Sequence, residues 1–108
     1  MRLVFCGTPQ FAVPTLEALF NAGHTVELVL SQPDRPGGRR LEVQFSSVKQ
    51  FVRQRGLALS QPEKIRSNPE LQERLAGIAP DAVIVVAYGR LIPPWMLALP
   101  RYGNLNLH

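Results

Sequence analysis

Cysteine is almost absent from this chain of 108 residues, which has Cys6 alone. A single cysteine excludes an intramolecular disulfide and a cysteine-based zinc cluster. Long apolar runs are absent too, because the most apolar stretch, residues 82–89, is far shorter than the roughly 20 residues that cross a membrane. The apolar stretch at residues 3–6 is too short for a secretory signal. We therefore expect a cytoplasmic protein with no membrane contact.

Common cofactor and metal motifs are also missing. The segment "GTPQFAVP" begins at Gly7 and has one glycine where the Gly-x-Gly-x-x-Gly dinucleotide fingerprint needs three, and Pro9 removes a backbone amide that phosphate could use. The chain contains no His/Glu zinc helix and no Gly-x-Ser-x-Gly elbow. A nicotinamide, flavin or metal site is therefore not expected.

The composition is that of a globular protein, with 45% hydrophobic and 19% charged residues. The formal net charge of +4 comes mainly from arginine, since the chain has only two lysines. Such a charge suits an anionic partner and equally suits a solvated basic surface. Charge alone leaves both interpretations open.

Apolar runs and helical spacings alternate along the chain. Residues 2–7, 24–34, 57–62, 81–89 and 103–108 are predicted strands, and residues 14–24, 46–56, 68–77 and 93–100 are predicted helices. Asn68 is a candidate N-cap with Pro69 at the first helical position, and Gly56 follows a predicted helix end. The order βαβαβαβαβ predicts one α/β domain, an open parallel sheet covered by helices.

One long segment, Ser31 to Phe45, lacks any regular pattern and holds two prolines, two glycines and three arginines. We expect an exposed, mobile loop there. A loop of this length is either functional or a tolerated insertion, and its basic content favours an anionic ligand if it binds one.

The last predicted strand carries a candidate catalytic pair. Asn106 and His108 are two residues apart, so a strand puts both on one face and puts Leu105 and Leu107 on the other. An amide that donates to a developing oxyanion and an imidazole that moves a proton are the minimum for acyl transfer. The same spacing also fits polar residues on an edge strand, so by itself it leaves the question open.

Four segments together resemble one known family. "MRLVFCGTPQFAVPTLEAL", "SQPDRPGGR", "VVAYGRLIPPWML" and "YGNLNLH" match, in order and spacing, the amino-terminal part of the methionyl-tRNA formyltransferases, which belong to the 10-formyltetrahydrofolate-dependent formyltransferases. The resemblance covers essentially all 108 residues. It implies a Rossmann-like, mostly parallel sheet with flanking helices.

The resemblance also implies a reaction. Family members transfer a formyl group from 10-formyltetrahydrofolate to the α-amino group of methionine on initiator tRNA, for translation initiation. Asn106 would then hold the formyl oxygen, and His108 would transfer protons. The family's catalytic aspartate and the Ser-Leu-Leu-Pro stretch after the histidine are not in the chain. Residues 1–108 would thus be the amino-terminal portion of a catalytic domain and would be inactive alone. The complete enzyme would be a monomer, and its carboxyl-terminal tRNA-binding domain would not be part of these 108 residues.

Two more groups of residues take roles from the resemblance. The segment "AYGRLIP" matches the part that clasps the pteridine ring, which implies that Arg90, Leu91 and Ile92 bind folate, although the two apolar residues equally suit a core. The irregular segment matches an insertion that reaches the tRNA acceptor end. Its cations would contact phosphates, and they are Arg35, Arg39 and Arg40.

The arginine-rich segment departs from the family at one position, because Glu42 stands where a positive charge is expected. Two alternatives stay open at this stage. One is a formyltransferase for another amine, such as glycinamide ribonucleotide or an amino-sugar nucleotide, and the other is a non-catalytic nucleotide-binding or interaction module of the same fold.

Overall fold

The computed structural model describes residues 1–7, 12–33, 35–37, 42–44 and 47–107. A parallel five-stranded sheet, in the order β5-β2-β1-β6-β7, forms its centre. Its strands are β1 (Arg2–Gly7), β2 (Thr25–Leu30), β5 (Leu59–Ser60), β6 (Ala82–Val86) and β7 (Asn104–Leu107). The predicted open parallel sheet is confirmed.

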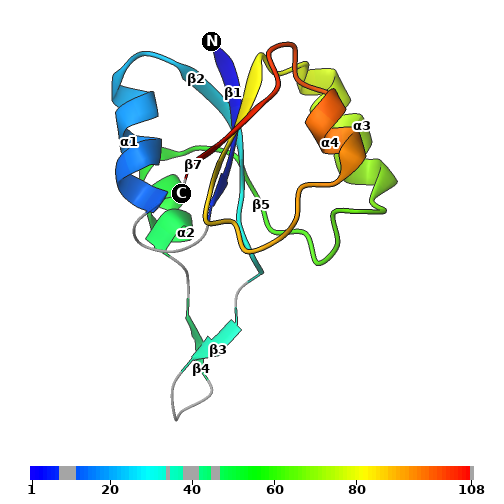
Figure 1. Ribbon diagram of the computed structural model, residues 1–108. Coiled ribbons are helices and arrows are strands. Elements are labelled where there is room, and N and C mark those ends of the chain that lie inside the picture. Colours follow the sequence, from blue (N-terminus) through cyan, green and yellow to red (C-terminus); the bar gives the residue numbers. More distant parts are fainter. Residues whose placement is uncertain (8–11, 34, 38–41, 45–46, 108) are drawn as a thin grey trace.

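Helices cover both faces of this sheet (Figure 1). One face is covered by α1 (Val13–Asn21) and α2 (Ser47–Arg55), and the other by α3 (Pro69–Ile78) and α4 (Pro94–Ala98). This arrangement is the layered α/β architecture that the alternating sequence pattern predicts. Within the described part of the chain, no helix is both long enough and apolar enough to cross a membrane.

The core has two halves, because the central strands are buried on both faces. In β1, Leu3 and Phe5 pack with α1 and α2, whereas Val4 and Cys6 pack with α3 and α4. Burial on both sides explains why these strands are continuously apolar rather than alternating. Cys6 is fully buried, and desolvation raises the pKa of its thiol far above the usual value, so it behaves as a small apolar side chain.

Local sequence signals correctly predicted the start of α3 and the end of α2, whereas α1 and α4 end two or three residues earlier than predicted. Asn68 Oδ1 accepts a hydrogen bond of 3.0 Å from the Leu71 amide, which makes Asn68 the N-cap of α3, and Pro69 is the first helical residue. Gly56 follows α2 with a φ of +69°, a left-handed conformation that glycine adopts readily. These local rules need no tertiary contact, which is why they could be read from the sequence.

The segment Ser31 to Phe45 is more regular than predicted. It contains a second, two-stranded antiparallel sheet of β3 (Arg35–Gly37) and β4 (Glu42–Gln44), in which Pro36 pairs with Val43. Proline and glycine have low strand propensity, so the sequence did not predict β3. A two-stranded ribbon tolerates both residues, because each of its strands is an edge strand. The two strands lie apart from the five-stranded sheet, beyond its carboxyl end (Figure 1).

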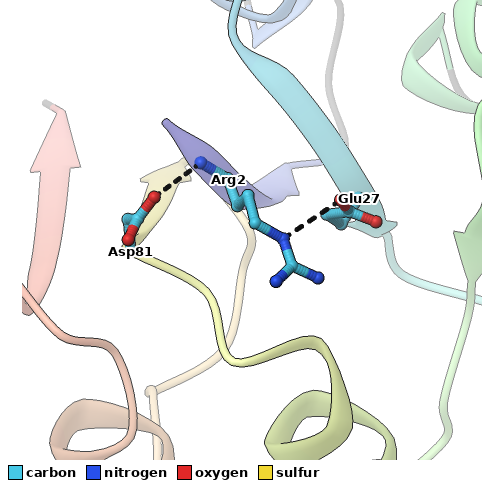
Figure 2. A network of polar contacts seen from close by, with 3 residues as sticks. All are labelled: Arg2, Glu27 and Asp81. Carbon is cyan, nitrogen blue, oxygen red and sulfur yellow. Dashed lines mark hydrogen bonds and ion pairs between the residues drawn. The ribbon is translucent and has the colours of Figure 1, made fainter.

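Polar contacts join three strands at the opposite, amino-terminal end of the sheet (Figure 2). The Arg2 amide donates to Asp81 Oδ2 at 2.8 Å, and the Asp81 amide donates back to the Arg2 carbonyl oxygen at 2.8 Å. Arg2 Nε also contacts Glu27 Oε1 at 3.3 Å. The start of β1 is thereby tied to β2 and to the residue that precedes β6.

Candidate active site

Polar and glycine-rich segments gather at the carboxyl end of the sheet, where ligands bind in open α/β folds. A hollow of about 470 Å³ lies there between the ends of β6 and β7. The turn Ala87–Leu91 lines it from one strand, and Asn106 and Leu107 line it from the other. Two segments that are well separated in the sequence therefore form one site.

The turn after β6 has an unusual backbone. Ala87 has a φ of +48° and Gly89 a φ of +88°. The positive φ of Gly89 favours glycine, and a Cβ there would also lie 2.7 Å from Gln32 Nε2, so the end of the Gln32 side chain would have to move. A non-glycine residue such as Ala87 in the left-handed region costs about 1 kcal/mol or more, and such strain is often found at functional sites.

Tyr88 points inward from this turn and is 1% exposed, packed among the core residues next to α3 and α4. The pKa of Tyr88 is raised to about 12, mainly because the phenol is buried; the nearby Cys6 contributes to the rise and the Arg90 guanidinium opposes it. Tyr88 is therefore neutral at physiological pH and anchors the turn to the core.

The three residues predicted to bind folate have different surroundings. Arg90 lines the hollow, and its Nη1 donates a 2.8 Å hydrogen bond to the Pro62 carbonyl oxygen. Leu91 is 93% exposed and also lines a second hollow of about 260 Å³, whereas Ile92 lines that second hollow and packs partly against the core. Leu91 is thus a surface residue, and the core interpretation fits only Ile92.

Asn106 reaches the hollow from β7, where it lies opposite Val85 in the parallel register. β7 is held in turn by Asn104, whose Nδ2 donates to the carbonyl oxygens of Met96 and Leu97 at 3.3 Å each. Since Asn104 and Asn106 are two residues apart, the strand has one asparagine fixed on α4 and one at the hollow.

Comparison with known sequences decides the family. A sequence profile described as "Formyl transferase" matches residues 1–108, the whole of the chain. The chain belongs to the formyl transferase family. The resemblance inferred from the four sequence segments is therefore confirmed at the family level.

Individual members of the formyl transferase family are also similar to the chain. A methionyl-tRNA formyltransferase from Acidobacterium capsulatum is 66% identical over 108 residues, and one from Koribacter versatilis is 56% identical over 108 residues. Both matches cover all of this chain, which spans only 35% of each relative. The chain is thus about a third as long as these curated relatives.

A solved structure supports the fold. Glycinamide ribonucleotide transformylase 1 from Geobacillus kaustophilus superposes with a TM-score of 0.68 over 99% of this chain and 57% of that chain. The two sequences are 22% identical, so this similarity bears on the fold alone.

Of the four predicted site residues not yet placed, the structure describes one. His108, Arg39 and Arg40 lie outside the described residues. Arg35 is in β3, opposite Gln44 in the antiparallel register. The structure therefore brings together Asn106, Arg90 and Leu91 from the predicted set.

Two side-chain hydrogen bonds near the site were not predicted from the sequence. Trp95 Nε1 donates to the Ile65 carbonyl oxygen at 2.9 Å. Gln61 Nε2 donates to the Gln32 carbonyl oxygen at 3.0 Å. Each bond runs from a side chain to a backbone carbonyl oxygen about 30 positions away, so no motif or periodicity in the sequence predicts it.

Proposed function

We propose that the full-length protein transfers a formyl group from 10-formyltetrahydrofolate to the α-amino group of methionine esterified to initiator tRNA. The observation that carries this proposal is the 66% identity, over the entire chain, to a relative named methionyl-tRNA formyltransferase. Because the chain spans 35% of that relative, we assign the activity to a longer protein. Residues 1–108 would be the amino-terminal portion of its catalytic domain, and the enzyme would act as a cytoplasmic monomer.

The hollow at the carboxyl end of the sheet suits the formyl donor. Its volume of about 470 Å³ lies within the range of roughly 300–1,000 Å³ that is usual for small-molecule sites. Leu91 offers an exposed apolar surface for the flat pteridine ring. The turn Ala87–Leu91 lines the hollow and would place backbone groups close to the bound ring. In this proposal Arg90, Leu91 and Ile92 form the folate-binding wall.

The chemistry follows from the two polar side chains of the last strand. Attack of the methionine amine on the formyl carbon forms a carbon–nitrogen bond and turns the carbonyl oxygen into an oxyanion, which Asn106 Nδ2 would stabilise by donating a hydrogen bond. His108 would accept the proton that the attacking amine loses. The bond from the formyl carbon to N10 of the folate then breaks, and N10 takes up a proton. The role of His108 rests on its spacing from Asn106 and on the family resemblance.

Formylation assays with the full-length protein test this proposal. Asn106→Ala should lower kcat by about 10² to 10³, the effect of removing one oxyanion donor. Asn104→Ala is the comparison variant, because it makes the same change on the same strand and weakens the contact of β7 with α4 without removing a donor from the hollow. Its kcat should fall by less than about tenfold, which separates loss of strand support from loss of the oxyanion donor.

Two results would contradict the proposal. One is methionyl-tRNA formylation that proceeds without 10-formyltetrahydrofolate, and the other is undiminished formylation by Asn106→Ala. Replacing methionyl-tRNA by glycinamide ribonucleotide in the same assay tests the alternative acceptor, which the names of the relatives do not favour.

A further inference from the structure

Two side chains tie one apolar segment to a single neighbouring loop. Arg90 precedes the segment Leu91–Pro94, and Trp95 follows it. Arg90 Nη1 donates to the Pro62 carbonyl oxygen at 2.8 Å, and Trp95 Nε1 donates to the Ile65 carbonyl oxygen at 2.9 Å. Both acceptors lie in the loop between β5 and α3, so the four intervening residues are fixed at both ends.

The backbone of the segment is held at its carboxyl end, where the Pro93 carbonyl oxygen accepts from the Met96 and Leu97 amides at 2.9 and 3.0 Å and Pro94 begins α4. Residues 91–93 belong to no strand or helix, and neither proline has an amide to donate. Ile92 packs partly against the core, while Leu91 is 93% exposed. The bonds of Arg90 and Trp95 add support on both sides of the exposed Leu91.

Leu91 lines both of the hollows described above, and no other described residue lines both of these two. Within the second hollow it lies beside Arg66 and the two prolines. A small displacement of Leu91–Pro94 would change the shape of both spaces at once. The bonds of Arg90 and Trp95 thus control the wall on which a flat ligand would rest.

We propose that Arg90 and Trp95 are positioning residues, which clamp Leu91–Pro94 onto the β5–α3 loop and so set the affinity for the formyl donor. The proposal rests on the proposed function and deepens it. It gives Arg90 a specific way to act, because the guanidinium works through the Pro62 carbonyl oxygen rather than as a charge on the ligand. Trp95 follows Pro94, which lines the second hollow, but is not itself among the lining residues. Like Arg90, it would act on the ligand by fixing the position of Leu91–Pro94.

Steady-state kinetics of the full-length protein test the clamp. Arg90→Met removes the donor and keeps much of the aliphatic length, and Trp95→Phe removes the indole N–H and keeps an aromatic ring. The KM for 10-formyltetrahydrofolate should rise about tenfold for Arg90→Met and about threefold for Trp95→Phe, since a bond from a charged donor is the stronger one. In both variants kcat and the KM for methionyl-tRNA should stay within about twofold, because neither side chain contacts the reacting atoms.

Arg101→Met and Tyr102→Phe are the matched controls. Arg101 stacks on the Tyr102 ring at 5.1 Å in the turn before β7, at the other end of that strand from Asn106. Both controls should leave the KM for the donor unchanged. The clamp is wrong if Arg90→Met raises this KM no more than Arg101→Met does, or if the loss appears in kcat instead.

Salt separates positioning from direct charge attraction. If Arg90 held the donor's carboxylates, the defect of Arg90→Met would shrink between 50 and 300 mM NaCl as screening increases. A positional defect should be independent of salt.

Hydrogen exchange adds a readout without catalysis. The Met96 and Leu97 amides donate to the Pro93 carbonyl oxygen, and both should exchange faster in Arg90→Met and Trp95→Phe than in the two controls. If the parent protein forms no formyl-methionyl-tRNA, the proposed function fails, whereas unchanged exchange in the variants contradicts the clamp itself.

Discussion

Among single residues, Tyr88 joins the site to the core more directly than any predicted site residue. Its ring packs with Cys6 and Met96 on the α3 and α4 side of the sheet, and its backbone belongs to the turn that lines the larger hollow. Any change that ionises this phenol would place a charge in an apolar environment.

Because the phenol of Tyr88 is buried, we expect the free energy of unfolding to fall at alkaline pH. An unfolded tyrosine loses its proton near pH 10, whereas burial holds the pKa of Tyr88 at about 12. Between these values the unfolded state binds fewer protons than the folded state, so the free energy of unfolding falls as the pH rises, by about 2 kcal/mol from this residue. Urea unfolding at pH 9 to 11.5 should show a steeper decline in the parent than in Tyr88→Phe. Equal slopes would mean that Tyr88 ionises at its ordinary pKa.

Gly7 predicts a steric effect at the end of β1. A Cβ at this position would lie 2.8 Å from Phe5 Cε1 and 2.9 Å from the Val86 carbonyl oxygen, and the latter is backbone that cannot easily move. Gly7→Ala should therefore lower the free energy of unfolding by about 1–3 kcal/mol. Gly77→Ala is the control, since nothing lies within 4 Å of its Cβ on α3, and it should stabilise by about 0.5–1 kcal/mol. Two changes of the same sign in urea unfolding would contradict this interpretation.

The candidate site was predictable from sequence only where its residues belong to local motifs. Asn106 and Arg90 stand in short matched segments, and the structure lines one hollow with both. The partners that support the site, Pro62 and Ile65, contribute backbone carbonyl oxygens. Every residue has a backbone carbonyl group, so the sequence does not indicate which carbonyl oxygen will accept a hydrogen bond from a distant side chain.

At the scale of elements, apolar runs and caps predicted nearly every strand and helix, because both are local signals. The hairpin was the exception, since its pairing depends on two short segments meeting across a turn. Strand β5 is only two residues long, shorter than the six residues predicted, because Leu59 and Ser60 alone pair with β2. Pairing partners rather than propensity decide such boundaries.

The contacts at the amino-terminal end of the sheet predict which bond holds β1 in place. Asp81→Ala removes the acceptor of the Arg2 amide and should lower the free energy of unfolding by about 1–2 kcal/mol. Asp81→Asn keeps an oxygen acceptor and should cost about half as much. Glu27→Ala breaks only the half-exposed contact with Arg2 and should cost less than about 0.5 kcal/mol.

Urea unfolding of these three variants checks the order Asp81→Ala, Asp81→Asn, Glu27→Ala. A Glu27→Ala cost equal to that of Asp81→Ala would show that the ion pair, rather than the backbone bond, ties the strands together. The KM for the formyl donor should not change in any of them, because Arg2 and Asp81 lie where β1 and β6 begin, whereas the larger hollow lies where β6 and β7 end.

In the whole molecule, the two ends of the sheet differ: one holds the strands together and the other carries the candidate binding site. The amino-terminal end joins strands through Arg2, Asp81 and the Tyr102 amide, which donates to the Asp81 carbonyl oxygen at 2.7 Å. The carboxyl end has the hollows, the strained turn and the hairpin that leaves the body of the domain (Figure 1). Substitutions of Arg2 and Asp81 should therefore act on stability alone, whereas substitutions of Asn106 and Arg90, which line the larger hollow, should act on the reaction and on ligand binding.

The hairpin gives this division its clearest test. If Arg35, Arg39 and Arg40 contact phosphates, replacing all three by alanine in the full-length protein should raise the KM for methionyl-tRNA at least about tenfold near physiological salt. The dependence of log KM on log salt concentration should become shallower by about one unit for each phosphate that the variant no longer neutralises. The KM for the formyl donor and the urea midpoint should not move, because β3 and β4 pair with each other and not with the main sheet. An increase in donor KM together with tRNA KM would instead show that the hairpin and the donor site act as one unit, coupled through Gln32, which precedes the hairpin and approaches Gly89 in the strained turn.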